Sequence, residues 1–354
     1  MAICDYDLSK WAVQDPKSIR ELVEAIDGSG YGTVFVTDSL GRLLASVTDG
    51  DIRRALLRGS GLDSPARAAL HTGVVSLLEG SEWGPVIARG LKHGLTDYPL
   101  VDVSGRLIGV KTLPKADRGS SRENTVVIMA GGKGLRLRPL TEHTPKPLLV
   151  VGGKPILQRI VENLRDEGFA RIVIAVNYLA EQIEDYFADG RNFGVDIEYV
   201  REDDPLGTAG ALSLVPNLSS LPLVVMNADV VLAASVAQML DFHVDRGSTV
   251  TVAAKVVEST VPYGVLITDE AVVRRIDEKP VRRDLVNAGV YVVAPDVVES
   301  VPPGQFLDMP DLIAQYSPSG RVFAFPIHEA WADLGHPDEL RKAQAQMNFR
   351  GDPR

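Results

Sequence analysis

From residue 124 onward the chain alternates apolar runs with amphipathic stretches, and this pattern restricts the fold more than any other feature. Five runs predict strands: TVVIMA (125–130), RIVIAVN (171–177), DIEYVRE (196–202), LVVMNAD (223–229) and TVTVAAKVV (249–257). Near-continuous Val and Ile runs connected by helices are typical of a mostly parallel sheet covered on both faces. We therefore expect a Rossmann-like α/β domain over residues 124–350. The segments YGVLITD, AVVRRIDEKP and LVNAGVYVV predict shorter strands of a second, mixed sheet.

The region before residue 115 contains an internal repeat. VFVTDSLGRLLASVT (34–48) aligns with YPLVDVSGRLIGVKT (98–112) at a constant offset of 64 residues. Each copy predicts a strand, a turn at Gly41 or Gly105 and a second strand, and each copy follows a helical stretch. Self-similarity at this period indicates two copies of one supersecondary unit, here an α+β module over residues 1–118. The polar segment KADRGSSREN (115–124) predicts an exposed linker between the two domains.

Composition narrows the functional classes. The 354 residues suit two or three domains. Lys and Arg number 37 against 47 Asp and Glu, a formal net charge of −10, which argues against nucleic-acid binding because that needs a basic face. The single cysteine, Cys4, excludes an internal disulfide and a cysteine zinc site, as expected in a reducing compartment. No apolar stretch approaches the roughly 20 residues that span a bilayer, and the N-terminus lacks a signal-peptide pattern. We expect a cytoplasmic protein with no nucleic-acid or membrane partner.

The first predicted strand leads directly into a glycine-rich loop, AGGKGLRLRPL (130–140). Glycines let backbone N–H groups approach phosphate oxygens, and nearby arginines add charge-assisted donors. At the carboxyl end of a strand, such a loop lies where open α/β sheets bind ligands. The nucleotide-binding residues predicted here are Ala130, Gly131, Gly132, Gly134 and Arg136. The alternative is a turn in which the glycines serve packing alone.

Two common phosphate-binding motifs do not account for this loop. A dinucleotide-binding G-x-G-x-x-G sequence needs a third glycine where Leu137 stands, and no nearby lysine completes G-x-x-x-x-G-K-[ST]. Six residues past the loop, Lys146 lies between Pro145 and Pro147, so its backbone is restrained and it cannot sit inside a helix. A restrained lysine near such a loop predicts a point charge aimed at a phosphoryl group. A solvated lysine in a turn is the alternative.

The loop and Lys146 belong to an ordered set of motifs that resembles the sugar-1-phosphate nucleotidyltransferases. These enzymes join an NTP to a sugar 1-phosphate and release pyrophosphate. The motifs are AGGKGLRLRPLTEHTPKPLLVVGGKPIL (130–157), PLGTAGAL (205–212), NAD (227–229), YGV (263–265), EKP (278–280), NAGVY (287–291) and WADLGHPDEL (331–340). Within this family the chain looks most similar to the glucosamine-1-phosphate guanylyltransferases of bacterial legionaminic acid synthesis, and then to the mannose-1-phosphate guanylyltransferases.

The resemblance implies roles for individual residues. Asp229, at the end of an apolar strand, and Asp333 would hold Mg²⁺, the cofactor that suits hard oxygen ligands and phosphoryl transfer. Arg136 and Lys146 would clamp phosphates and, with Asp229, form the catalytic set. Gly207 would belong to the nucleotide site, and the expected sugar-phosphate contacts are Gly264, Glu278, Lys279 and Asn287. Two alternatives stay open: a helix cap at Asp229, and a solvated charge pair at Glu278 and Lys279.

Glu202 bears on the choice of base. In relatives that use thymidine or uridine nucleotides, a Gln commonly lies five residues before the glycine that corresponds to Gly207. A carboxylate only accepts hydrogen bonds, so Glu202 suits guanine, which presents a ring N–H beside an exocyclic amine. We expect GTP and transfer of GMP. The alternatives are thymidylyl, uridylyl or cytidylyl transfer, with Glu202 an exposed acid at a strand end. Leu135 stands where relatives usually carry Thr or Ser, which removes one hydroxyl near the triphosphate.

The N-terminal repeats resemble CBS motifs, which fold in pairs and commonly sense adenine or guanine nucleotides. The resemblance rests on the two repeated segments and on TDGDIRRALLRG (48–59), where Thr48 and Asp51 match the pair that holds the ribose of a regulatory nucleotide. The second copy has Thr112 but carries Lys115 in place of the Asp. A helix cap at Thr48 and Asp51 is the alternative, and both roles can hold together. Because such modules often associate face to face, we expect a homo-oligomer.

Two other functional classes fit the sequence less well. A non-catalytic, nucleotide-sensing subunit should have lost the basic phosphate contacts or the metal aspartates, and the chain keeps all of these: Arg136, Lys146, Asp229, Lys279 and Asp333. A dinucleotide oxidoreductase fails on the glycine spacing. The sequence therefore predicts an enzyme whose partners are an NTP and a sugar 1-phosphate, and it leaves the sugar open because a few hydroxyl contacts decide it.

Overall fold

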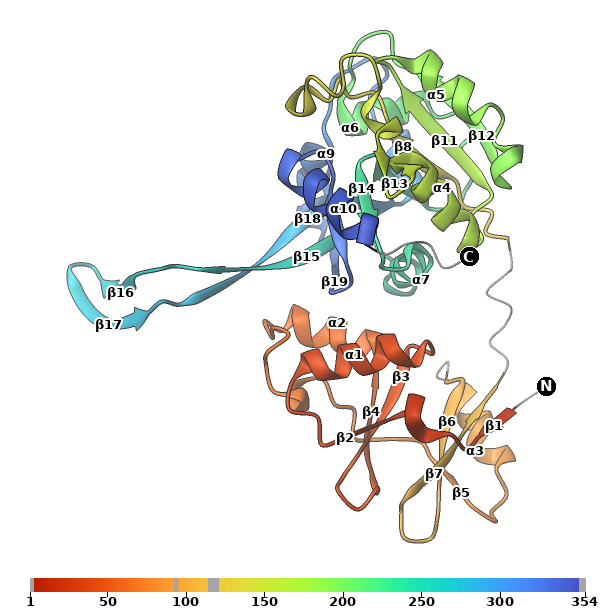
Figure 1. Cartoon of the computed structure of the whole chain (residues 1–354), viewed down its shortest axis with the longest axis vertical. Coiled ribbons are helices and arrows are strands. Elements are labelled where there is room, and N and C mark those ends of the chain that lie inside the picture. Colours follow the sequence, from red (N-terminus) through yellow and green to blue (C-terminus); the bar gives the residue numbers. More distant parts are fainter. Residues whose placement is uncertain (1–2, 92–94, 114–120, 350–354) are drawn as a thin grey trace. The chain divides into compact units, whose positions relative to one another are not determined.

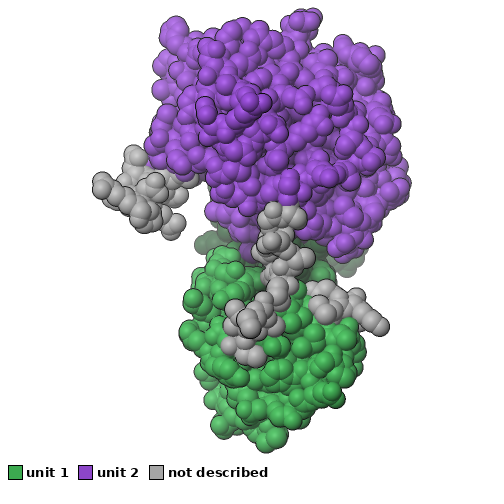
Figure 2. Space-filling model, turned by 90° about the vertical axis from the view of Figure 1, so that its right-hand side faces the viewer, with its two compact units in different colours: residues 1–117, 256–284 green, residues 118–255, 285–354 purple. Residues whose placement is uncertain are grey.

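The computed structural model describes residues 3–91, 95–113 and 121–349, and the chain divides into two compact units. Unit 1 comprises residues 1–117 and 256–284, and unit 2 comprises residues 118–255 and 285–354 (Figure 2). The sequence-based division into 1–118 and 124–350 differs from this one at residues 256–284. Much of the predicted linker, Lys115 included, lies outside the described residues.

The N-terminal part of unit 1 consists of two small sheets with helices packed on them. The strand order is β2-β3-β4 in one sheet and β1-β7-β6-β5 in the other. The strands are β1 (Ile3–Asp5), β2 (Ala12–Gln14), β3 (Thr33–Thr37), β4 (Leu43–Thr48), β5 (Leu77–Leu78), β6 (Asp97–Val101) and β7 (Leu107–Thr112). The helices are α1 (Ile19–Ser29), α2 (Asp49–Leu57) and α3 (Gly84–Leu91), with 3₁₀ turns η1 (Leu8–Lys10) and η2 (Ala66–Ala68).

The repeat in the sequence is also a repeat in structure. The hairpins β3–β4 and β6–β7 are both antiparallel, and their register shifts at equivalent places. Gly41 and Gly105 adopt φ angles of 76° and 79° in the two turns, a conformation that is costly for residues with a Cβ atom. The N–H of Leu43 donates to the carbonyl of Gly105, and the N–H of Leu107 donates to that of Gly41, both at 3.0 Å. The two copies therefore pair through equivalent atoms.

Unit 2 is built on a seven-stranded sheet with the order β12-β11-β8-β13-β18-β15-β19 (Figure 1). β12, β11, β8 and β13 are parallel, β18 is antiparallel to β13, and β19 is parallel to β15. The strands are β8 (Val126–Met129), β11 (Arg171–Val176), β12 (Asp196–Arg201), β13 (Leu223–Asn227), β15 (Val250–Thr260), β18 (Val281–Val293) and β19 (Val322–Ile327). Two short antiparallel pairs are β9 (Val150–Val151) with β10 (Lys154–Pro155), and β14 (Val230–Leu232) with β20 (Trp331–Asp333).

Successive side chains of the sheet point to opposite faces, and helices cover both faces. On β8, Val126 and Ile128 pack with α4, α5, α7 and α10, whereas Val127 packs with α6, α8 and α9. The helices are α4 (Ile156–Asp166), α5 (Ala180–Phe187), α6 (Gly207–Gly210), α7 (Val236–Arg246), α8 (Pro295–Glu299), α9 (Met309–Tyr316) and α10 (Pro337–Phe349). The 3₁₀ turns are η3 (Leu135–Leu137), η4 (Lys146–Leu148), η5 (Arg191–Phe193), η6 (Ala211–Leu214) and η7 (Ser317–Ser319). The predicted α/β fold with a largely parallel central sheet is confirmed.

The prediction of a second mixed sheet is wrong for LVNAGVYVV (285–293). These residues lie in β18 and join the main sheet beside β13. Val292 enters one core and Tyr291 enters the other, which is why an uninterrupted apolar run suits this interior strand. YGVLITD and AVVRRIDEKP form the antiparallel pair β16 (Gly264–Asp269) and β17 (Val272–Glu278), a two-stranded sheet at the end of the hairpin that β15 and β18 begin (Figure 1).

Within the described parts of the chain, no helix has both the length and the apolar character needed to cross a membrane.

A buried histidine links α7 to the sheet of unit 2. His243 is buried near the end of α7, and its Nδ1 atom lies 3.0 Å from the hydroxyl of Thr251 on β15. Burial, together with the positive charge of Arg321, lowers the pKa of His243 to about 4. The imidazole is therefore neutral in the folded protein through most of the acidic range.

Acid should destabilise unit 2 through His243. The pKa of the folded state lies below the usual value of 6.5, so the unfolded chain binds the proton first as the pH falls. The contribution of the neutral imidazole to the free energy of unfolding is complete above the usual pKa. It is lost as the pH falls from about 6.5 to about 4, and the loss is at most about 3 kcal/mol. Urea unfolding between pH 7 and pH 4 should show a shallower pH dependence for His243→Gln than for wild type. The exposed His71 supplies the control, His71→Gln, and equal slopes for all three proteins would contradict the prediction.

Candidate active site

The carboxyl ends of the neighbouring parallel strands β8, β11 and β13 border a cavity of about 540 Å³. Parallel strands end at one edge of a sheet, so the segments that follow them meet there. All of its lining residues belong to unit 2. The lining includes nine residues that the sequence analysis selected: Ala130, Gly131, Gly132, Gly134, Arg136, Lys146, Glu202, Gly207 and Asp229.

The glycine-rich loop has a fixed backbone. Gly134 adopts a φ of 60°, and a Cβ atom on it would lie 2.9 Å from a methyl group of Thr141. The hydroxyl of Thr141 donates to the carbonyl of Gly134 at 2.8 Å, and the N–H of Ala130 donates to the carbonyl of Ala175 on β11 at 2.8 Å. Only glycine fits at 134 without strain. The loop thus reaches the cavity with its conformation already set.

Lys146 reaches the same cavity from the second motif. It is the first residue of the single 3₁₀ turn η4 and follows the extended residue Pro145, so it does not lie within an α-helix. Its side chain is mostly buried, and its ammonium forms an ion pair with the carboxylate of Asp229, which follows β13. The lysine is therefore held over the end of the sheet and does not project into solvent.

The second aspartate comes to Asp229 through the short pair β14 and β20. The N–H of Leu334 donates to the carbonyl of Asp229 at 2.9 Å, and the N–H of Gly335 donates to Oδ1 of Asp333 at 2.8 Å. A Cβ atom on Gly335 would lie 2.8 Å from Oδ1 of Asp333 and 2.9 Å from Oδ2 of Asp229. Two carboxylates thus converge at one point. Such a donor set suits a hard divalent cation that completes its shell with water and phosphate oxygens.

Arg136 extends the positive charge along the cavity. It lies in the 3₁₀ turn η3, and its Nη1 atom is 2.9 Å from Nε2 of His336. The same Nε2 atom lies 3.8 Å from Oδ2 of Asp333. The imidazole nitrogen therefore lies near both the guanidinium of Arg136, which lines the cavity, and the carboxylate of Asp333.

Glu202 closes the other side of the cavity. Its Oε2 accepts the N–H of Leu206 at 2.8 Å, and its backbone carbonyl accepts the side-chain amide of Asn177 at 2.6 Å. A Cβ atom on Gly131 would lie 2.7 Å from Oε1, so this glycine leaves the carboxylate its space. Burial raises the pKa of Glu202, and the hydrogen bond from Leu206 offsets part of that effect. The cavity wall thus contains a carboxylate acceptor whose charged form has lost part of its hydration.

The match to a known family begins at the first strand of this sheet. The profile described as "Nucleotidyl transferase" matches residues 125–349. The chain belongs to the nucleotidyl transferase family. It is 34% identical over 221 residues to a mannose-1-phosphate guanylyltransferase catalytic subunit beta of Drosophila melanogaster, with 60% of each chain covered. It is 33% identical over 230 residues to a UTP--glucose-1-phosphate uridylyltransferase of Synechocystis, with 59% of each chain covered.

A solved structure of a putative glucose-1-phosphate thymidylyltransferase from Bacillus anthracis shares the fold, with a TM-score of 0.53 and 23% identity. That comparison covers 65% of this chain and 97% of the other. The chain spans only about 60% of the length of the curated relatives named above. Membership therefore rests on the region that contains the cavity.

The four predicted sugar-phosphate residues do not line this cavity. Gly264 and Glu278 lie opposite each other on β16 and β17 in unit 1, and Lys279 follows them with a φ of 46°. Asn287 lies on β18 in unit 2, where its side chain accepts the N–H of Gly289 and donates to the hydroxyl of Tyr291. Contact of these four residues with the sugar phosphate therefore stays a prediction.

Thr48 and Asp51 form a complete capping box at the start of α2. The side chain of Thr48 accepts the N–H of Asp51, and the carboxylate of Asp51 accepts both the N–H and the hydroxyl of Thr48. Arg54 also forms an ion pair with Asp51. The capping alternative therefore accounts for both residues, and a role in nucleotide binding remains a prediction.

Several cavity residues escaped the sequence analysis. Asn177 and Asn227 are polar residues at the ends of the apolar runs of β11 and β13, a pattern that marks the ligand edge of a sheet and was available in the sequence. Thr208 and Gly335 lie in the motifs PLGTAGAL (205–212) and WADLGHPDEL (331–340), but the sequence assigned them no role. Phe306 carries no comparable pattern, because a distant loop brings it to the cavity.

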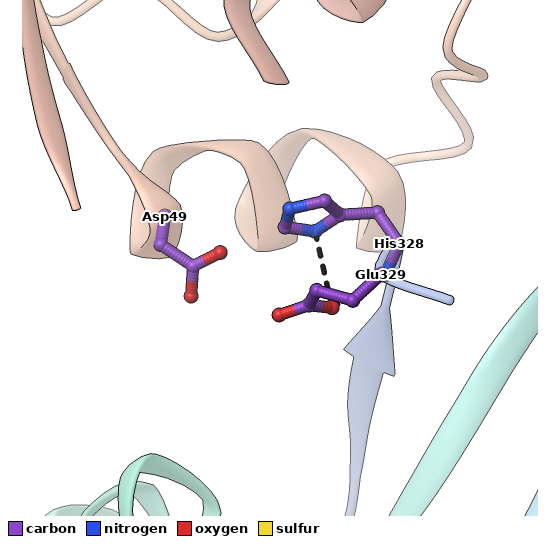
Figure 3. A group of neighbouring side chains, drawn as sticks. All are labelled: Asp49, His328 and Glu329. Atoms are coloured by element: carbon purple, nitrogen blue, oxygen red, sulfur yellow. Dashed lines mark hydrogen bonds and ion pairs between the residues drawn. The ribbon is translucent and has the colours of Figure 1, made fainter. Parts of the chain in front are cut away.

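A separate polar cluster follows β19. Nδ1 of His328 lies 3.6 Å from Oε2 of Glu329, which also accepts the backbone N–H of His328 at 2.9 Å (Figure 3). Lys255 donates to the backbone carbonyls of both residues at 3.1 and 2.8 Å, and burial lowers its pKa. We interpret this cluster as a structural link between β15 and the chain after β19. Asp49, also labelled in Figure 3, begins α2 of unit 1.

Replacing Glu202 with Gln should stabilise the fold at neutral pH. The folded-state pKa lies above the usual 4.5, so the charged carboxylate costs stability, and this cost grows as the pH rises through the raised pKa. Below about pH 4 the carboxyl is protonated in both states and the cost disappears. Gln keeps an acceptor for Leu206. In urea unfolding, the gain in free energy of unfolding of Glu202→Gln over wild type should therefore be larger at pH 7 than at pH 4. The change measured for Glu299→Gln, at an exposed glutamate, is subtracted as the control. The opposite trend would contradict the interpretation.

Proposed function

We propose that the protein transfers a nucleotidyl group, GMP from GTP, to a sugar 1-phosphate and releases pyrophosphate. The observation that carries this proposal is a cavity that begins with a glycine-rich loop and is lined by Arg136, Lys146 and Asp229, with the carboxylate of Asp333 beside Asp229 at Gly335. The activities named for the relatives, mannose-1-phosphate guanylyltransferase and UTP--glucose-1-phosphate uridylyltransferase, support the reaction class.

The proposed reaction is an in-line displacement. An oxygen of the sugar phosphate forms a bond to the α-phosphorus, the bond from that phosphorus to the oxygen bridging to the β-phosphate breaks, and pyrophosphate leaves with the electron pair. Catalysis then consists mainly of positioning and charge neutralisation. Lys146 lies beside Asp229 and would neutralise the reacting phosphate, while Arg136 would hold the leaving pyrophosphate.

Asp229 and Asp333 would hold Mg²⁺. Their oxygens converge beside Gly335, and two carboxylates plus substrate phosphates are a common magnesium donor set. When bound, the ion supplies Lewis-acid charge neutralisation on the phosphates. Lys146 forms its ion pair with one of these carboxylates, so the ammonium limits the repulsion between the two aspartates before the substrates bind.

Glu202 supports guanine as the base. Glu202 lines the cavity and its Oε1 lies beside Gly131, while its Oε2 retains a second lone pair after accepting the N–H of Leu206. Two donors on one edge of guanine match two carboxylate oxygens. The carbonyls on both sides of the ring N–H in uracil or thymine would face the same negative charge, which disfavours those bases.

The remaining parts of the proposal concern the sugar and regulation. Glu278, Lys279, Asn287 and Gly264 would contact the sugar phosphate, as the resemblance to the family implies. The N-terminal pair of repeats would form a CBS pair that binds a regulatory nucleotide near Thr48 and Asp51 and contributes to a homo-oligomer. The symmetric hydrogen bonds between the two copies support a paired module.

Pyrophosphate release tests the reaction class. The assay combines GTP, dTTP, UTP, CTP or ATP with glucosamine-, mannose- or glucose-1-phosphate in the presence of Mg²⁺. We expect release with GTP and at least one sugar, and a loss of at least about a hundredfold in Asp229→Asn because a metal ligand is removed. Asp245→Asn, at an exposed aspartate on α7, is the matched control. No release anywhere in the grid, or equal rates in Asp229→Asn and wild type, would refute the proposal.

The base preference of Glu202→Gln tests the role of that carboxylate. We expect kcat/KM for GTP to fall by about tenfold to a hundredfold, as for the loss of one charged hydrogen-bonding partner, while the relative rate with UTP or dTTP rises. Glu299→Gln should leave both values unchanged. Unaltered discrimination between GTP and UTP in Glu202→Gln would remove the argument for guanine and keep the reaction class.

A further inference from the structure

An aromatic side chain of the cavity wall is exposed to solvent. Phe306 lines the cavity, yet 65% of its surface is accessible. A large apolar ring gains free energy when it leaves water, so its exposure in a concave, ligand-sized site is informative. Leu135 is another exposed apolar residue that lines the cavity, but it adjoins Arg136 on the phosphate loop.

The residues that follow Phe306 form hydrogen bonds with the segment 206–210. The carbonyl of Leu307 accepts the N–H groups of Ala209 and Gly210, both at 2.9 Å. The carboxylate of Asp308 accepts the N–H and the hydroxyl of Thr208 at 3.0 and 3.2 Å. Exposure of the ring therefore does not reflect a loose loop. The two residues that follow the ring, Leu307 and Asp308, are held by hydrogen bonds to residues 208–210.

A backbone connection joins the segment that carries this ring to Glu202, and both side chains line the cavity. The N–H of Leu206 donates to Oε2 of Glu202, and the carbonyl of Leu206 accepts the N–H of Leu307 at 2.8 Å. Leu206 thus binds through its N–H to the carboxylate of Glu202 and through its carbonyl to the segment that carries Phe306. A planar base that hydrogen-bonds to Glu202 presents an apolar face to its surroundings, and an aromatic ring is the side chain that best covers such a face.

We propose that Phe306 stacks on the face of the nucleobase and forms, with Glu202, the base subsite of the cavity. This inference rests on the proposed function, because it takes a nucleotide as the ligand. Glu202 reads the edge of the base and therefore selects among bases, whereas stacking on Phe306 tolerates any base and supplies affinity. The ring is covered only when a nucleotide is bound.

The test compares a nucleotide with a ligand that lacks a base. Dissociation constants for GTP and for inorganic tripolyphosphate, each with Mg²⁺, are measured by calorimetry on the full chain of wild type, Phe306→Ala and Phe306→Tyr. We expect Phe306→Ala to weaken GTP binding at least about tenfold and to leave tripolyphosphate binding within twofold, since only the base loses its platform. Phe306→Tyr, which keeps the ring, should restore the affinity for GTP.

Other outcomes separate the possible failures. Equal weakening of GTP and tripolyphosphate in Phe306→Ala, or no rescue by Phe306→Tyr, would show that the substitution disturbs the cavity in general and would overturn the inference. A raised KM for the sugar 1-phosphate with unchanged GTP affinity would place the ring at the sugar and overturn it as well. If wild type turns over and Phe306→Ala binds GTP as tightly as wild type, the stacking role is refuted and the proposed function stands. Failure of wild type to bind GTP removes the proposed function together with the inference.

Discussion

The parallel pairing of β8 with β11 on one side and β13 on the other is the constraint on which the site depends. It brings Ala130, Asn177 and Asp229 to one edge of the sheet, although they come from separate segments. Reversing any of these strands would move its terminal residue across the sheet, roughly 13 Å for four residues. The two apolar cores, one on each face, fix this pairing because the strands bury side chains in alternation.

Charge at this edge is balanced by residues from distant parts of the chain. Asp229 and Asp333 would repel each other if they were alone, and the ammonium of Lys146 limits that repulsion. Gly335 leaves the space between the two carboxylates open, since any side chain there would collide with them. The burial of Glu202 costs stability for a different reason, because its charged carboxylate loses hydration. Such costs are common where a site is arranged for a ligand and not for the free protein.

Much of the fold and part of the site could be predicted from local sequence. Apolar runs with intervening helical periodicity identify β8, β11, β12, β13 and β15, and the repeat identifies the two hairpins of unit 1. Glycine spacing and the prolines around Lys146 identify two segments that line the cavity. The prediction of a second sheet failed for residues 285–293, because pattern alone does not reveal the partner of a strand, and β18 continues from the hairpin into the main sheet.

The sequence by itself determined the main strands, the two hairpin turns of the repeat and the residue types available for phosphate chemistry, because these depend on neighbours along the chain. Only the tertiary structure decided that Asp333 meets Asp229 and that Phe306 reaches the cavity of Glu202. Those meetings follow from the β14–β20 pair and from backbone hydrogen bonds between loops. Such contacts join residues far apart in the sequence, and no local pattern encodes which of them will pair.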